Sequence, residues 1–422
     1  MNNYLTRDTQ AIILLCGVLG KESAVKPLSL TEYSKLVQWL INVQLRPGDL
    51  LVPENIGEAS IGSGLDNERL KSLLVRGVQL GFAIEEWNRN GIWIISRSDE
   101  EYPVRYKKHL KDKAPPLLFG VGNRALLQGG GLGIVGSRNV DGEGEAFTRN
   151  VAELCALNQI PVVSGGARGV DQISMKATLE AGGFAIGVLA ENLLKKSLER
   201  DARHAIADER LLLLSPYHPN ARFTVGTAMG RNKLIYAMAD YGLVVSSEYK
   251  KGGTWAGAEE ELRRDNAIPV FVRVGANVPS GNTKLLDLGA TSWPASLDHN
   301  MVQEQLKDLA YLSRKKQTIE NQNLFDFLDP QASLSINPEI PFHELVHEND
   351  SWFDLVESKT NSQSIYRAVL PVILQKLDRP TTADELAKTL DVNRTQLLTW
   401  LQQAAKEKVI KKLSNPGRYE KV

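Results

Sequence analysis

The stretch between Gly131 and Gly169 constrains the fold more than any other part of the chain. Two short apolar runs each lead directly into a loop of small residues that ends in an arginine: Gly136-Ser137-Arg138 and Ser164-Gly165-Gly166-Ala167-Arg168. A helical pattern separates them, so the order is that of a βαβ unit in a parallel sheet. In such a sheet, the loops after the carboxyl ends of the strands form the ligand crevice. Backbone N–H groups and guanidinium groups suit phosphate oxygens, so the stretch predicts a phosphate-binding crevice.

The alternation of strands and helices continues to about residue 295. Strands are expected at 185–189, 211–215, 243–246 and 269–274, and one charged helix at 191–207. Two further helix starts carry cations, namely Gly230-Arg231-Asn232-Lys233, expected to open a helix to Tyr241, and Lys250-Lys251-Gly252-Gly253-Thr254. Because a parallel sheet brings most of these loops to one edge, four cationic loops together favour an anionic ligand.

Composition narrows the functional class. The chain has 422 residues, of which 42% are hydrophobic, which is enough for two to four domains. It carries 50 basic and 50 acidic residues, so any basic surface for nucleic acid has to be local. Cys16 and Cys155 lie in apolar helical contexts, which is typical of buried thiols in a reducing compartment. No apolar run is long enough for a membrane span and no signal peptide is recognised, so a cytoplasmic protein is expected.

The pattern indicates four segments. Residues 1–91 read as short helices near 8–19, 30–44 and 68–81, either a helical cap for the next domain or a helix-hairpin nucleic-acid module of the SAM-like kind. Residues 92–295 form an α/β domain with an extended, Rossmann-like parallel sheet that begins with strands at 92–96 and 117–121. Residues 296–363 comprise a helix with a partner-facing apolar side and a polar linker. Residues 364–422 read as a winged helix.

The winged-helix expectation rests on local signals. Thr382 and Glu385 form a capping box before one helix. A helix from about Asn393 places Leu397, Trp400, Leu401 and Ala404 inward, and a β-hairpin follows at 409–422. From Arg394 onward there are seven basic residues and two acidic ones. Winged helices bind either nucleic acid or protein; the basic excess favours nucleic acid, with candidate contacts at Arg394, Thr395, Gln396, Lys411, Lys412 and Arg418.

Two motifs are expected to mislead. Gly131-Leu132-Gly133-Ile134-Val135-Gly136 fits the dinucleotide pattern GxGxxG, but its spacers are themselves the strand, so no nicotinamide or flavin cofactor is predicted. His343-Glu344-Leu345-Val346-His347 fits the zinc-protease pattern HExxH, but it lies within a linker segment, so no metal is predicted. The loops also lack a coherent acid–base pair, so no catalytic residue is assigned.

Taken in order, the motifs resemble the DNA-processing protein A family (DprA, also called Smf). The resemblance covers about residues 92–293 and rests on five stretches: Ile134–Arg138, Val163–Asp171, Gly230–Ile235, Gly252–Thr254 and Val270-Phe271 followed by Gly281-Asn282, Leu285 and Gly289-Ala290. It implies an extended Rossmann fold and a non-catalytic protein that binds single-stranded DNA and loads the recombinase RecA in natural transformation, typically as a homodimer. Arg138, Arg168, Arg231 and Lys233 would then meet phosphates, cradled by the Gly136–Ser137 and Gly165–Gly166 backbones.

The chain departs from the family pattern at several positions. Ile173-Ser174-Met175 stand where an alanine–histidine pair is usual, Gly252 and Gly257 replace customary polar residues, and Lys233 stands where an arginine is usual. A DprA-like sensor of nucleotides or DNA in defence against mobile elements therefore stays open as an alternative. So does a nucleotide hydrolase resembling the lysine-decarboxylase-like phosphoribohydrolases, because Gly252–Glu260 loosely echoes their glycine-rich motif with the glutamate offset by one residue.

Overall fold

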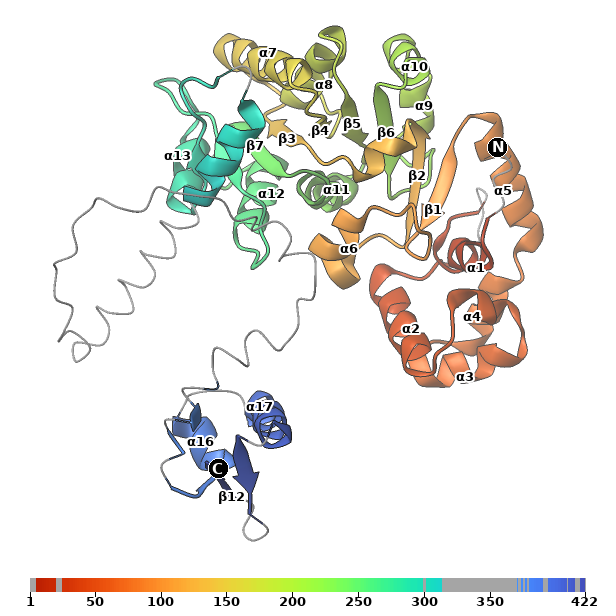
Figure 1. Ribbon diagram of the computed structural model, residues 1–422. Helices are drawn as coiled ribbons and strands as arrows, with labels where there is room; N and C mark the ends of the chain where they lie inside the picture. The colour runs from red at the N-terminus through yellow and green to blue at the C-terminus, as the bar shows by residue number, and fades with distance from the viewer. Residues whose placement is uncertain are drawn as a thin grey trace, which may run out of the picture. The chain divides into compact units, whose positions relative to one another are not determined.

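The computed structural model describes two parts of the chain. It covers residues 5–19, 25–298 and 301–312 and, in the C-terminal part, a few positions between 370 and 377 together with 379–389, 394–407, 409–413 and 418–421 (Figure 1). The chain divides into two compact units, residues 1–333 and 334–422. The HExxH segment at 343–347 and most of the expected linker lie outside the described residues.

A nine-stranded sheet forms the centre of the first unit, as far as that unit is described. Its order is β1-β2-β6-β5-β4-β3-β7-β8-β9. Neighbours from β6 to β9 pair in parallel, whereas β2 pairs antiparallel with both β1 and β6. The strands are β1 (Trp93–Ser96), β2 (Leu117–Gly122), β3 (Leu132–Gly136), β4 (Val162–Ser164), β5 (Ala185–Val188), β6 (Leu211–Ser215), β7 (Tyr241–Ser246), β8 (Val270–Val272) and β9 (Thr291–Ser292).

The strand order reverses between β3 and β7. From β3 the chain builds β4, β5 and β6 outward on one side, then crosses back to place β7, β8 and β9 on the other side. This is the doubly wound arrangement, which confirms the α/β, Rossmann-like prediction. The Gly131–Gly136 pattern lies along β3 itself, as the sequence indicated, and so does not form a phosphate-binding turn. Ligands of such sheets bind beyond the carboxyl ends of the strands at the reversal.

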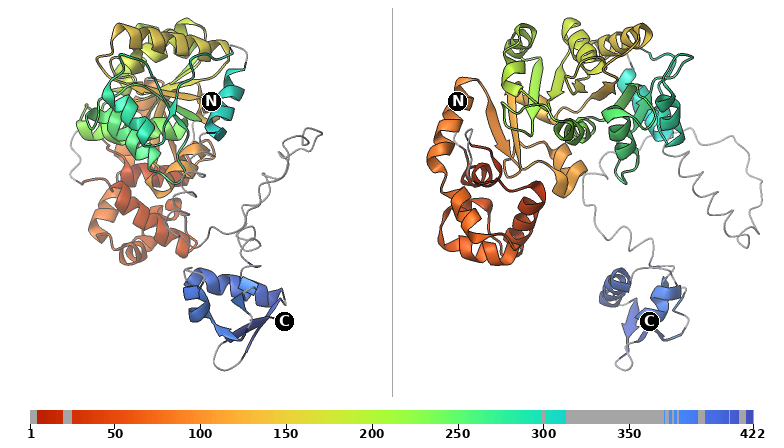
Figure 2. Two further views of the ribbon diagram at one scale, coloured as in Figure 1. Left: turned by 90° about the vertical axis from the view of Figure 1, so that its left-hand side faces the viewer. Right: turned by 180° about the vertical axis from the view of Figure 1, so that it is seen from behind.

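Helices cover both faces of the sheet (Figures 1 and 2). Alternate side chains of each strand face opposite layers, as Leu132 and Ile134 of β3 join one hydrophobic cluster and Val135 joins another. The second of these clusters contains α6, α11, α12 and α13, and α7 and α8 lie on the opposite face. The helices are α6 (Val104–Leu110), α7 (Gly142–Leu157), α8 (Val170–Glu180), α9 (Leu193–Ser197), α10 (Arg200–Ala207), α11 (Val225–Met238), α12 (Gly252–Leu262) and α13 (Ser280–Asp287).

The single charged helix expected at 191–207 is wrong. Two short helices, α9 and α10, stand there instead. Leu193 of α9 and Ala205 of α10 are both buried, in a cluster that also contains Leu211 and Leu213 of β6. The chain therefore turns between the helices so that each can bury its own apolar residues, which the charge pattern does not reveal.

The N-terminal helices are α1 (Arg7–Cys16), α2 (Leu30–Asn42), α3 (Glu54–Ser63), α4 (Asn67–Leu74) and α5 (Gly77–Arg89). The one helix expected at 68–81 is wrong, because the chain breaks at Arg76 between α4 and α5. The buried Arg76 guanidinium donates hydrogen bonds to Leu14 and Gly17 carbonyls at the end of α1. These helices share one hydrophobic cluster with β2 and β6, so the boundary expected at residue 91 does not separate two compact units; it stays a proposal.

The helix at 302–312 packs on its own sheet. Val302 and Leu306 are 1% exposed and lie in the cluster that includes Leu132 and Phe271. The expectation that this apolar side faces a partner protein is therefore wrong. A periodic apolar stripe predicts that one face of a helix is buried, but it does not predict which element covers that face.

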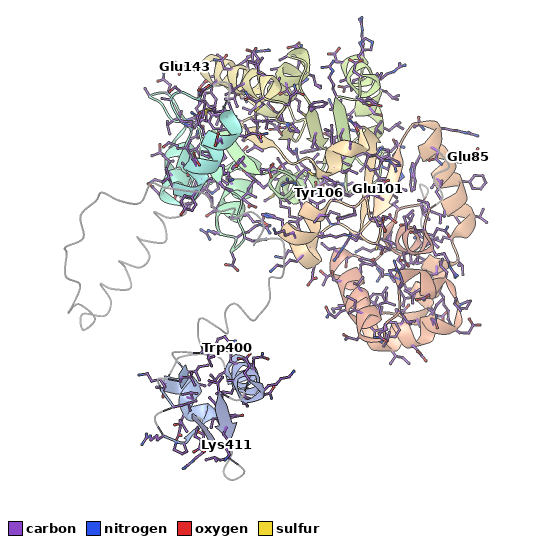
Figure 3. The ribbon with its side chains drawn as sticks, viewed as in Figure 1. Glu85, Glu101, Tyr106, Glu143, Trp400 and Lys411 are labelled. Atoms are coloured by element: carbon purple, nitrogen blue, oxygen red, sulfur yellow. The ribbon has the colours of Figure 1, made fainter. Side chains whose placement is uncertain are left out.

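The C-terminal unit contains β10 (Thr381–Thr382), α16 (Ala383–Thr389), α17 (Arg394–Lys406), β11 (Ile410–Lys412) and β12 (Arg418–Lys421). The predicted capping box is present, since Glu385 N donates to Thr382 Oγ1 and Thr382 N donates to Glu385 Oε2, both at 3.2 Å. The predicted hairpin is also present as the β11–β12 pair. Trp400 on α17 is buried and Lys411 on β11 is exposed (Figure 3). The winged-helix assignment itself stays a proposal.

We predict that Leu306→Ala lowers the free energy of unfolding of the first unit by roughly 2–5 kcal/mol, because it leaves a cavity in a closed cluster. Leu312→Ala is the matched control, since Leu312 is 59% exposed, and should change stability little. Chemical denaturation of the two variants checks this. Wild-type stability in Leu306→Ala would show that the helix does not pack on the sheet.

Candidate nucleic-acid interface

Two adjoining cavities lie beyond the carboxyl ends of the central strands. The first measures about 730 Å³ and lies between the loops after β3 and β7 and the start of α11. The second measures about 620 Å³ and lies beside the loop after β4. They share Arg138, Ala167, Phe223 and Arg231, and we call the two together the crevice. Its position matches the strand-order reversal, where this fold class binds ligands.

Asp171 ties together the two glycine loops on which the sequence prediction rested. It sits in the first turn of α8 and is 6% exposed. Its carboxylate lies near the backbone N–H groups of Gly136 at the end of β3 and of Gly165 and Ala167 after β4. Burial raises the pKa of Asp171, and Arg231 and these N–H groups oppose that shift. The residue is therefore a structural anchor within α8, and Gly169 occupies the N-cap position of that helix.

Arg231 is the buried partner of this carboxylate. It is 5% exposed, its Nη1 lies 3.6 Å from Asp171 Oδ2, and the same nitrogen donates to the Val188 carbonyl at 3.2 Å. Burial lowers the pKa of Arg231. Gly165 is required here, because a Cβ at that position would collide with the guanidinium. Arg231 Nε is buried and has no hydrogen-bond partner among the described residues.

The predicted start of α11 at Gly230 is wrong. The helix begins at Val225, because Thr224 and Thr227 form a reciprocal capping box with hydrogen bonds of 3.0 and 3.1 Å. It ends at Met238. Gly226 and Gly230 therefore lie within the helix, although Gly230 was expected at its start. Arg231-Asn232-Lys233 consequently occupy the middle of α11 rather than an exposed helix start.

Mid-helix placement sends these three side chains in different directions, since successive residues rotate by about 100°. Arg231 lines the crevice, and Asn232 donates to the Gly253 carbonyl at 2.9 Å, joining α11 to α12. Lys233 does not line the crevice and instead lines a separate cavity near α1. Lys233, which was predicted to meet phosphates, therefore does not line the crevice with Arg231, and its role stays a prediction.

Residues of α13 hold the loop after β7 in place through hydrogen bonds. Asn282 is 1% exposed, accepts a hydrogen bond from Ser247 N at 2.8 Å, and donates to the carbonyls of Val245 and Arg273. A Cβ on Gly281 would strike the Ser247 carbonyl. The Gly281-Asn282 pair thus fixes the path that leads to Lys250 and Lys251. The helix α12 that follows has no side-chain cap, so its first N–H groups point toward the crevice unpaired by a cap.

The exposed cation of the first loop stacks on an aromatic ring. The Arg138 guanidinium carbon lies 5.1 Å from the centre of the Phe223 ring, and both residues line both cavities. Arg138 makes no ion pair within the described part of the chain. Phe223 is 40% exposed and leads to Val225 and Met229, which are also exposed on the first turns of α11. The lining of the crevice thus combines exposed apolar side chains with exposed cations.

Most of the predicted phosphate-binding residues line the crevice. They are Gly136, Ser137, Arg138, Gly165, Gly166, Arg168, Arg231, Asn232, Lys250, Lys251, Gly252, Gly253 and Thr254. Ser164 does not, because it is fully buried and donates to the Ile134 carbonyl at 2.6 Å. Phe223 and Lys196 also line the crevice, although the sequence motifs did not indicate them. Phe223 ends a loop of polar and aromatic residues, which was a usable signal, whereas Lys196 lies in an ordinary charged helix.

The hydrolase alternative finds no support in the crevice. Glu259 accepts hydrogen bonds from Trp255 Nε1 and Arg263, and Glu260 pairs with Arg264. Neither glutamate lines the crevice. In addition, no group of three His, Cys, Asp or Glu side chains suited to a metal ion occurs in the described residues. No described helix is long and apolar enough to cross a membrane.

We predict that Arg231→Ala lowers the free energy of unfolding by roughly 3–5 kcal/mol, because it leaves the Asp171 carboxylate buried without its partner. The double variant with Asp171→Ala should cost clearly less than the two single losses combined. Denaturant unfolding of the four proteins closes this cycle, with Arg168→Ala as the control because Arg168 is exposed. Additive losses would show that the two side chains do not interact.

Comparison with known proteins identifies relatives of this chain and a solved structure with the same fold. DNA processing protein DprA from Bacillus subtilis (strain 168) is 31% identical over 196 residues, covering 43% of this chain and 62% of that protein. Protein Smf from Escherichia coli (strain K12) is 30% identical over 159 residues, covering 37% and 42%. The chain thus spans less than two thirds of the length of these relatives. The crystal structure of DprA from Streptococcus pneumoniae shares the fold, with a TM-score of 0.53 and 21% identity over 68% of this chain and 95% of that one.

The family comparison covers the region that carries the crevice. Residues 93–304, half of the chain, match the family described as DNA recombination-mediator protein A. This family comprises DNA-binding mediators rather than enzymes. The match includes both glycine loops, α11, the loop after β7 and the Gly281-Asn282 pair. The chain therefore belongs to the DNA recombination-mediator protein A family, as the sequence motifs indicated.

Proposed function

We propose that the crevice binds single-stranded DNA, with backbone phosphates on one wall and bases on the other. The observation that carries the proposal is the Arg138–Phe223 stack, which joins an unpaired cation and an exposed aromatic ring where the two cavities meet. Single-strand binding proteins combine these two features, a positive groove for the backbone and aromatic platforms for the bases. Membership of a DNA recombination-mediator family supports the same ligand.

The phosphate wall draws its charge from exposed residues. Arg138 and Lys251 make no ion pair within the described residues, and Lys250 stacks at 5.2 Å on the Tyr249 ring. The uncapped start of α12 adds backbone N–H groups, which favour anions through both hydrogen bonding and the helix dipole. Two carboxylates line the first cavity, Asp171 and Glu248. Asp171 is engaged by Arg231, so the wall keeps an excess of positive charge.

We further propose that the bound strand is passed to a recombinase of the RecA type, that the chain acts as a homodimer, and that the C-terminal unit contacts duplex DNA. Lys411 and Arg418 support the last point, because both are exposed on the three-stranded sheet of that unit. Arg394, Thr395 and Gln396 begin α17, but the orientation of their side chains, like that of Lys412, lies outside the described structure.

Two substitutions separate the phosphate and base roles. We predict that Arg138→Ala weakens binding of single-stranded DNA and reduces the slope of log K against log salt by about 0.7, because one phosphate contact is lost. Phe223→Ala should weaken binding by roughly 1–3 kcal/mol with an unchanged slope, since stacking releases no counterions. Fluorescence anisotropy over a salt series measures both quantities.

The control for this pair is Arg203→Ala, which removes an exposed arginine of α10 that does not line the crevice. It should leave affinity and slope as in the wild type. If Arg138→Ala and Phe223→Ala both retain wild-type affinity and slope, the crevice is not the binding groove.

Removal of the C-terminal unit tests the division of labour. A chain ending near residue 360 keeps the whole first unit, so we predict unchanged binding to single-stranded DNA and loss of binding to duplex DNA. Gel shifts with both probes measure this, with circular dichroism and size-exclusion chromatography to confirm the fold and oligomeric state. Loss of single-strand binding by a folded truncated chain in its original oligomeric state would place the main site in the C-terminal unit.

A further inference from the structure

A third cavity lies on the side of α11 away from the crevice. It measures about 400 Å³, within the size range of small-ligand sites. The N-terminal helices, the segment before β2 and the loop after β6 line it, and its surface is largely apolar, including Val18, Leu30 and Pro116. Two lysines, Lys113 and Lys233, complete the lining together with His218. None of these residues lines the crevice.

The lysines of this cavity lack the acidic partners that surface lysines often find. Neither the Lys113 nor the Lys233 ammonium group makes a hydrogen bond or ion pair with any described residue. Lys233 is half-buried, and burial lowers its pKa, as do the nearby charges of Arg264 and Lys113, while Glu260 opposes the shift. Glu260 is itself paired with Arg264. The cavity therefore holds two cationic groups that an anionic ligand would neutralise.

His218 adds a neutral hydrogen-bond donor. Its Nδ1 accepts from Asn220 N at 3.1 Å, so in the neutral ring the proton lies on Nε2. Burial lowers the pKa of His218, while Glu86 opposes this. The ring packs against the Trp87 and Phe119 rings at 6.1 and 6.5 Å, which fixes its orientation.

Three more lysines, which we call the rim lysines, precede Lys113 closely in the chain. Lys107 and Lys108 on α6, and Lys111 in the turn that leads to Lys113, are all exposed. None forms an ion pair with a described carboxylate, and Asp112 is the single acid among them. Tyr106, labelled in Figure 3, anchors α6 beneath these lysines, since it is fully buried. This run of lysines stands out in a chain whose net charge is zero.

The third cavity adjoins the crevice through α11 itself. Gly230 lines the third cavity, whereas its neighbours Met229 and Arg231 line the crevice. A helix with its side chains is about 10–12 Å across. At 3.4 Å per nucleotide, the spacing of a duplex strand, about three nucleotides bridge that width. A strand that occupies the crevice can therefore reach the lysines on the other side.

We propose that the third cavity is a second nucleotide subsite, which takes a phosphate at Lys113 and Lys233 and the attached base against Leu30 and Pro116. The proposal deepens the proposed function, because the nucleotide is then part of the single strand that leaves the crevice. The rim lysines accept the phosphates that follow. The same chemistry would also suit a free mononucleotide, and strand length distinguishes the two sources.

The test uses the full chain and oligothymidylates of about 5 and about 15 nucleotides, within the range of single-strand site sizes. Lys113→Gln and Lys233→Gln should each lower the affinity for the longer oligonucleotide by roughly tenfold, which is the effect of losing one charge-assisted contact. The affinity for the shorter oligonucleotide should stay unchanged. Lys71→Gln is the matched control, since this exposed lysine lies on α4 and pairs with Glu68. Thermal unfolding confirms the fold of each variant, and Lys113→Gln alters an exposed side chain.

The outcomes separate the second subsite from the crevice. Wild-type affinity of both variants for the longer strand overturns the second subsite and leaves the proposed function standing. Equal weakening of both lengths also overturns it, because the lysines would then act within the crevice site. If the wild type binds neither length, the proposed function fails. In that case, binding of thymidine monophosphate that both variants lose supports a free-nucleotide subsite. No binding of thymidine monophosphate overturns the subsite as well.

Discussion

The buried pair of Asp171 and Arg231 is the interaction on which the crevice depends. One carboxylate lies beside backbone N–H groups at the end of β3 and after β4 and beside the guanidinium of α11. Three segments far apart in the sequence are thereby held at one point. Burying two charges is costly unless they are paired. Here the guanidinium lies 3.6 Å from the carboxylate and also donates to the Val188 carbonyl. The glycine at 165 follows from this arrangement, since any side chain there would displace the guanidinium.

The residues of the family motifs have two physical roles: some are buried and hold loops in place, and others are exposed cations. Ser164, Arg231, Gly281 and Asn282 are buried and hold loops in place. Arg138, Lys250 and Lys251 are exposed on the loops so held. A short loop keeps a defined path only if its backbone groups are satisfied from elsewhere, and the buried residues provide those bonds. The exposed cations can then meet a ligand with little loss of backbone entropy.

The residues of α11 line two different cavities. The first turns of the helix present Val225 and Met229 to the crevice, its middle buries Arg231, and Lys233 emerges on the far side. One helix thus forms a wall of two separate cavities. A linear motif of adjacent residues cannot show this, because each step along a helix turns the side chain by about 100°.

The sequence by itself determined the α/β class, most strands of the sheet and the edge at which the crevice lies. These features depend on local periodicity and on glycine loops after apolar runs, which are properties of short segments. It also gave the capping box at Thr382 and the buried face of α17. Tertiary structure decided what periodicity cannot encode. Arg231 is buried because Asp171 meets it, the helix at 302–312 packs on its own sheet, and Phe223 reaches Arg138 across the crevice mouth. Each depends on contacts between segments distant in the chain, and a residue pattern records no such distances.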